Sequence, residues 1–151
     1  MWCQYKPYYY ENFPIARLKI LDFPHMHIDG IRTGGMKKEA FLALKESIEK
    51  DGLVNPIVIE VDSGPCYRIA MGNNRVEVIR QKGGEFIKAL VLFRSSQPVE
   101  SDGPCTHITD LESFMGKVHP GDSSWKKSGW ADRLLKFTAS RKMDKPWLVA
   151  Y

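Results

Sequence analysis

Between residues 36 and 94, short apolar runs alternate with two stretches of helical periodicity. Residues 36–51 place apolar side chains three and four positions apart, which predicts an amphipathic helix that ends just before Gly52. The β-branched run 56–61 predicts a strand, and 66–70 and 86–93 predict two more. These elements indicate a small domain in which strands and helices alternate.

Two further elements complete this domain. The tetrapeptide GNNR at 72–75 reads as a tight turn that opens a second helix, which ends at the glycine pair 83–84. Residues 16–24 alternate well enough to predict a first strand, followed by a polar loop. The predicted order is β–α–β–β–α–β over 16–94, an α+β domain with a small mixed sheet and helices.

The flanks differ from this domain in composition. Residues 1–15 are rich in aromatic side chains and read as an N-terminal arm, whose rings we expect to pack on the domain or a partner rather than stack on bases. Residues 95–106 read as a linker or loop. Residues 107–151 form a basic tail with two short predicted helices, over 106–116 and 130–141.

Composition narrows the class of protein. The chain has 151 residues, 43% of them apolar, which suffices for one domain with a packed core. The net charge of +4 is compatible with anionic partners. Three widely spaced cysteines form neither a disulfide framework nor a CxxC zinc motif. Without a signal peptide or an apolar run of about 20 residues, we expect a cytoplasmic protein that binds no membrane.

The GNNR turn carries the most informative chemistry. Gly72 lets the backbone turn sharply, and the free N–H groups of the following helical turn favour an anion. Arg75 can add a bidentate contact to phosphate oxygens. Asn73 and Asn74 offer hydrogen bonds without charge. Alone, this pattern is more typical of an ordinary Asn-rich helix cap beside a surface arginine than of a phosphate site.

The neighbouring motifs favour the phosphate site. In chain order they are Ser47-Ile48, Gly52-Leu53, Pro56-Ile57, Tyr67-Arg68-Ile69 and Gly72-Asn73-Asn74-Arg75. With these motifs, residues 16–94 resemble the ParB N-terminal domain of the ParB/sulfiredoxin superfamily, also called the ParB-like nuclease domain. The resemblance implies a nucleotide or phosphate site at Gly72 and Arg75. It also implies that the loop before the first helix lines this site, and that loop contains Arg32, Thr33, Gly34 and Gly35.

The chain departs from two relatives of this fold. Nucleotide-driven DNA clamps of the family usually have GERR at this turn. Here Asn73 and Asn74 replace the acid and the first arginine, so a carboxylate that could orient water is missing from the turn. The ENxQR segment and the DNA-reading domain of those clamps are not found in this sequence either. Sulfiredoxins place a catalytic cysteine directly after the glycine. Here Asn73 occupies that position and Cys66 lies on the preceding strand, so sulfiredoxin chemistry is not expected.

We therefore expect a nucleotide-binding accessory protein, phage- or plasmid-borne, that acts on or near DNA, with Mg²⁺ as the candidate companion of the nucleotide. The alternatives are a metal-dependent nuclease and a small-molecule kinase of the free-serine type, for which Asp29 is the candidate base. Fold analogy does not choose among these readings, and it leaves a homo-oligomer open.

Two weaker patterns complete the candidate sites. His25 and His27 form an HxH pair near Asp22 and Asp29, but loop histidines are the favoured reading and no metal site is predicted. Non-specific DNA binding is assigned to six basic side chains of the tail, which are Lys126, Lys127, Arg133, Lys136, Arg141 and Lys142.

Overall fold

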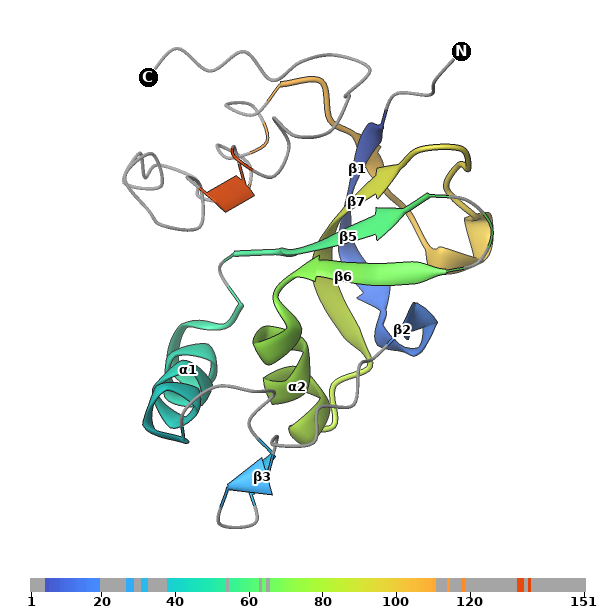
Figure 1. Ribbon diagram of the computed structural model, residues 1–151. Helices are drawn as coiled ribbons and strands as arrows, with labels where there is room; N and C mark the ends of the chain where they lie inside the picture. Colours follow the sequence, from blue (N-terminus) through green and yellow to red (C-terminus); the bar gives the residue numbers. More distant parts are fainter. Residues whose placement is uncertain are drawn as a thin grey trace.

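A computed structural model describes residues 5–19, 27–28, 31–32, 38–53, 55–62, 64, 66–110, 114, 118, 133, 134 and 136. Its main feature is a mixed six-stranded sheet, accompanied by two helices and a small hairpin (Figure 1). The sheet order is β2 (Leu18–Lys19), β6 (Tyr67–Met71), β5 (Ile57–Val61), β7 (Phe86–Phe93), β1 (Lys6–Pro14) and β8 (Thr106–His107). The hairpin pairs β3 (His27–Ile28) with β4 (Ile31–Arg32), and the helices are α1 (Lys38–Asp51) and α2 (Asn73–Gln81). The predicted α+β class is confirmed.

The centre of the sheet is built from the segments with the strongest apolar runs. β5 runs parallel to β7 and antiparallel to β6. All five residues of β5 are buried, which matches a β-branched sequence covered on both faces. The strands predicted over 56–61, 66–70 and 86–93 are therefore confirmed, as are the helices predicted over 36–51 and after Gly72.

The first predicted strand is much shorter than expected in the described residues. Residues 15–17 form a 3-10 turn, and among the described residues of the predicted run, 16–19, Leu18 and Lys19 pair with β6. Residues 20–24 lie outside the described residues. The hairpin of β3 and β4 was not predicted, because four residues carry too little periodicity to indicate a strand.

The N-terminal segment is a strand of the sheet, which corrects the reading of residues 1–15 as an arm. β1 pairs antiparallel with β7 along most of its length, from Lys6 opposite Phe93 to Pro14 opposite Phe86. Tyr9, Tyr10 and Phe13 are buried. The expectation that the rings pack on the domain is therefore met, and these three rings are not available for base stacking.

The two faces of the sheet have different covers. Ile57, Ile59 and Val61 point to the face on which Val76 of α2 packs, and α1 reaches the same side through contacts with α2. The opposite face carries Val58, Leu90 and Leu92. Its cover comes from later in the chain, because Ile108, Phe114 and Leu134 are buried in the same cluster. Figure 1 shows the helices below the sheet and the described C-terminal residues, in orange and red, on its other side.

The segment predicted as a linker also packs on the domain. Asp102, in a 3-10 turn over Glu100–Asp102, is buried, and its carboxylate accepts the Arg17 guanidinium at 2.8 Å. Thr106 and His107 form β8 instead of beginning the helix predicted over 106–116, because they pair with β1. Phe114, Val118, Arg133, Leu134 and Lys136 are helical. The sheet and its core therefore extend beyond residue 94.

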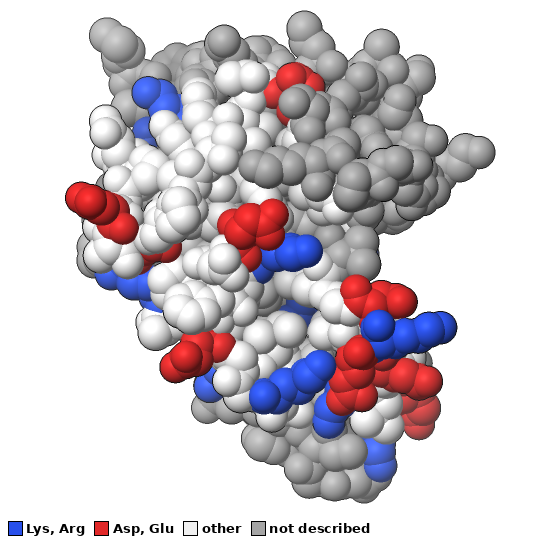
Figure 2. All heavy atoms as spheres, turned by 180° about the vertical axis from the view of Figure 1, so that it is seen from behind, with Lys and Arg blue, Asp and Glu red and all other residues white. Residues whose placement is uncertain are grey.

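The surface around the two helices carries both signs of charge. Lys45 and Lys50 of α1 are interspersed with Glu46 and Glu49, and on the face shown in Figure 2 blue and red side chains alternate over this part of the molecule. Over the described part of the chain, no helix is long and apolar enough to cross a membrane.

Candidate functional site

The turn between β6 and α2 is built around Gly72. Its φ of 106° and ψ of 23° place it in the left-handed region, which glycine tolerates without strain. A Cβ added here would lie 2.6 Å from Ile57 Cγ2 and 3.1 Å from Arg75 Nη2. The backbone therefore passes directly over β5, and only glycine fits. The turn predicted from the sequence is present at the predicted residue.

The helix that follows begins in the expected way. Gly72 is its N-cap and its carbonyl accepts the Val76 N–H at 3.0 Å, but no side chain caps the helix. The N–H groups of Asn73, Asn74 and Arg75 belong to the first turn, which an α-helix leaves without intrahelical partners. All three residues are half-buried. The arrangement provides the positive end of a helix dipole at a partly enclosed position.

Arg75 lies across the turn rather than projecting into solvent. Its Nη1 donates to the backbone carbonyls of Asn55 at 2.7 Å and Pro56 at 2.9 Å. Burial, together with the charge of Arg133, lowers the pKa of Arg75 to about 10. No carboxylate among the described residues pairs with it. The sequence predicted a free phosphate ligand, whereas the structure gives Arg75 a second role as a brace between α2 and the start of β5.

Most of the loop before α1 lies outside the described residues. Arg32 lies in β4, where it pairs with His27. Asp29, Thr33, Gly34 and Gly35, predicted as a base and as phosphate ligands, lie outside the described residues, as does His25. The described residues hold no group of three histidine, cysteine, aspartate or glutamate side chains suited to a metal ion. The phosphate contact implied for Arg32 by the family resemblance stays a prediction.

The basic tail supplies a residue that the sequence did not link to the turn. Arg133 and Lys136 are exposed and helical, and Leu134 between them is fully buried. Arg133 is close enough to Arg75 for its charge to act on that guanidinium. No local signal connects residues 58 positions apart, so sequence analysis could not find this pair. Lys126, Lys127, Arg141 and Lys142 lie outside the described residues.

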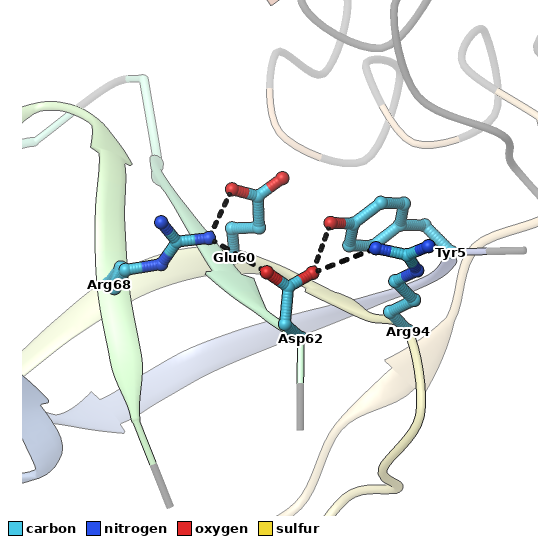
Figure 3. Close-up of polar contacts among 5 residues, drawn as sticks. All are labelled: Tyr5, Glu60, Asp62, Arg68 and Arg94. Atoms are coloured by element: carbon cyan, nitrogen blue, oxygen red, sulfur yellow. Dashed lines mark hydrogen bonds and ion pairs between the residues drawn. The ribbon is translucent and has the colours of Figure 1, made fainter. Parts of the chain in front are cut away.

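A second polar cluster lies where β1, β5, β6 and β7 meet (Figure 3). Arg68 Nη2 donates to Glu60 Oε1 at 2.9 Å and to Asp62 Oδ2 at 3.1 Å. The Tyr5 hydroxyl donates to Asp62 Oδ1 at 2.6 Å, and Arg94 lies 3.6 Å from the same oxygen. The Tyr5 hydrogen bond, helped by Arg68 and Arg94, holds the pKa of Asp62 below its usual value.

This cluster neutralises its own charges, since two arginines face two carboxylates. Its clearest role is to join the start of β1 to the ends of three other strands. The sequence signal was the E-x-D spacing of Glu60 and Asp62 on one strand, which places both side chains on one face of the sheet. Sequence analysis did not single it out.

The thiols lie away from the turn. Cys66 is exposed and precedes β6, and Cys105 is half-buried beside the sheet core. Asn73 follows Gly72, at the position where a thiol would be needed for sulfiredoxin chemistry. Cys66 therefore lies at the opposite end of β6 from Gly72.

Comparisons with known proteins identify the family to which residues 18–99 are similar. The family model described as the ParB N-terminal domain matches residues 18–99. No curated protein matches the chain. Among solved structures, the chain is similar to the C-terminally truncated chromosome-partitioning protein ParB from Caulobacter crescentus complexed with CTP-gamma-S, with 19% sequence identity and a TM-score of 0.39. The match covers 87% of this chain and 65% of that chain, so this chain matches only part of that protein.

Proposed function

The chain belongs to the ParB N-terminal domain family, and from this premise we propose that it binds a nucleotide through its phosphate groups at the Gly72–Arg75 turn and acts on or near DNA. The family match spans both the turn and the strands that position it. The proposal concerns binding by this domain. It does not include hydrolysis of the nucleotide, because Asn73 and Asn74 supply no carboxylate that could orient a water molecule.

The observation that carries the proposal is the environment of Arg75. A guanidinium that is partly removed from water loses hydration free energy, and it normally recovers part of this through an acidic partner. The described residues give Arg75 two carbonyl acceptors but no carboxylate. An anion beside the turn would supply the missing negative charge. Because Arg75 is partly shielded from water, its contact with a strongly charged group such as phosphate is strengthened.

The backbone around Arg75 suits the same ligand. Because Gly72 has no side chain, a phosphate oxygen can approach the first N–H groups of α2 without meeting a Cβ. Arg75 Nη1 is fixed by Asn55 and Pro56, which orients the rest of the guanidinium fork before any ligand arrives. Such preorganisation lowers the entropic cost of binding.

The test is a nucleotide screen on the full chain, with ATP, GTP, CTP and UTP, each with and without Mg²⁺. Thermal shift should find stabilisation by at least one of them, and titration calorimetry should then give its affinity. Arg75→Met should weaken that affinity by about ten- to a hundredfold, since a charge-assisted contact is worth roughly 1.5–3 kcal/mol.

The matched control is Arg80→Met, at the other end of the same helix, where Arg80 pairs with Glu77 at 3.1 Å. This variant should bind like the wild type. Stabilisation by no nucleotide at all would refute the proposed function, and equal affinity for the Arg75 and wild-type proteins would move the site elsewhere. Chromatography of the same mixtures should show unchanged nucleotide, in keeping with binding alone.

A further inference from the structure

The C-terminal segment is anchored next to the candidate site. Leu134 is fully buried in the cluster that contains Val58 of β5, and Met71 packs against the same cluster. Met71 directly precedes Gly72, and Val58 follows Pro56, which holds Arg75, by two residues. In Figure 1 the red segment around Leu134 lies beside the start of β5. The neighbouring residue Arg133 is therefore placed close to the turn by apolar packing.

Arg133 and Arg75 form a pair of like charges at this position. The Arg133 side chain is exposed, while Arg75 is half-buried and fixed by two carbonyls. Within the described part of the chain, neither guanidinium has a carboxylate partner. The charge of Arg133 adds to burial in lowering the pKa of Arg75, in keeping with the packing of Leu134 beside Val58. Two neighbouring cations without an acid repel each other unless an anion lies between them.

We propose that Arg133 is a second cationic ligand of the phosphate bound at the Gly72–Arg75 turn, so that the C-terminal segment completes the site. This inference rests on the proposed function, since it needs a nucleotide at the turn. Leu134 anchors the C-terminal segment, because its side chain is fully buried in the core. Arg133 lies on the solvent side and supplies the positive charge.

Linkage follows from this arrangement. A phosphate that contacts both arginines binds the β6–α2 turn and the C-terminal segment at once, so occupancy of the site stabilises the docking of residues 133–134. Conversely, loosening the segment weakens nucleotide binding. The ligand therefore connects parts of the chain that are 58 residues apart.

The experiment is calorimetric titration of the full chain with the nucleoside triphosphate that stabilises the wild type most. Arg133→Gln should lower the affinity about five- to tenfold, because an exposed charge-assisted contact is weaker than the buried one made by Arg75. Arg133→Lys should restore part of the loss. Lys82→Gln, which removes the same charge from the exposed opposite end of α2, should change affinity by less than about twofold.

A second measurement separates binding from folding. Without nucleotide, Arg133→Gln should melt at the same temperature as the wild type or slightly higher, because it relieves repulsion with Arg75. A lower melting temperature of the ligand-free variant would assign Arg133 to the fold and overturn the inference. Unchanged affinity of Arg133→Gln, with Arg75→Met impaired, would overturn this inference alone, whereas a wild type that binds no nucleotide would remove the proposed function as well.

Discussion

Replacing Gly72 with alanine tests the geometry on which the site depends. The added Cβ would lie 2.6 Å from Ile57 Cγ2 and 3.0 Å from Ile57 Cβ. Ile57 is fully buried in the central strand, so it has little room to move. The backbone φ of 106° is also one that alanine rarely adopts. Gly72→Ala should therefore destabilise the domain through two separate effects.

The magnitude follows from adding these effects. Left-handed backbone costs an alanine about 1–2 kcal/mol, and overpacking a filled core costs about 1–3 kcal/mol. The lower entropy of the unfolded alanine chain returns about 0.4–1 kcal/mol. We expect a net loss of roughly 1–5 kcal/mol, a large share of the stability of about 5–15 kcal/mol that is typical of a domain.

Gly83→Ala is the matched control. Gly83 has a φ of 80°, but a Cβ there meets nothing within 4 Å. It shares the backbone cost of Gly72 without the clash, so we expect a loss of only about 1 kcal/mol. The two variants should differ by the overpacking contribution alone.

Urea unfolding of both variants, followed by circular dichroism at constant pH and salt, measures this difference. Similar losses for the two variants would show that the turn does not press on β5 as described, and the reasoning would fail. If Gly72→Ala remains folded, its nucleotide affinity should still fall, because the new methyl group lies 3.1 Å from Arg75 Nη2 and would displace that guanidinium.

Three further predictions follow from the polar contacts and from the tail. Asp102→Asn should cost about 1–3 kcal/mol in urea unfolding, since it breaks the contacts of a buried carboxylate with Arg17 and Tyr67; no loss would mean that the 95–106 segment is not held there. The folded-state pKa of Asp62 is depressed, so the stability that Asp62 contributes is full above about pH 4 and is lost as the pH falls further. Asp62→Asn should therefore make the free energy of unfolding depend less on pH in this acid range. An unchanged dependence would contradict the depressed pKa of Asp62. Duplex DNA should bind weakly and without sequence preference, with an affinity that drops steeply as the salt concentration rises. In fluorescence-anisotropy titrations, a Lys126→Gln/Lys127→Gln double variant should show a weaker salt dependence than the wild type. Binding that does not depend on salt would exclude the tail as an electrostatic DNA-binding surface.

Local pattern was sufficient for the elements that depend on neighbours in the chain. The helical spacing of Phe41, Leu44 and Ile48 predicted α1, and the β-branched residues of 57–61 predicted β5, because both signals repeat within one element. The turn at Gly72 was also predictable. A glycine between a strand and a helix has few conformations open to it, and the left-handed one is observed.

β1 was not recognised, because three consecutive tyrosines between Pro7 and Pro14 hide the alternation that would mark a strand. Only the pairing with β7 decides which ring faces which side of the sheet. Such pairing depends on residues about 80 positions away. Periodicity within one segment contains no information about it.

The same limit applies to the site. The sequence by itself identified Gly72 and Arg75 as candidate phosphate ligands, because a helix start beside a glycine and an arginine is a local arrangement. The tertiary structure alone decided that Arg75 is held by the Asn55 and Pro56 carbonyls and interacts with the charge of Arg133. The physical reason is that burial and charge act through space, and the core that buries Leu134 sets which distant residues share that space.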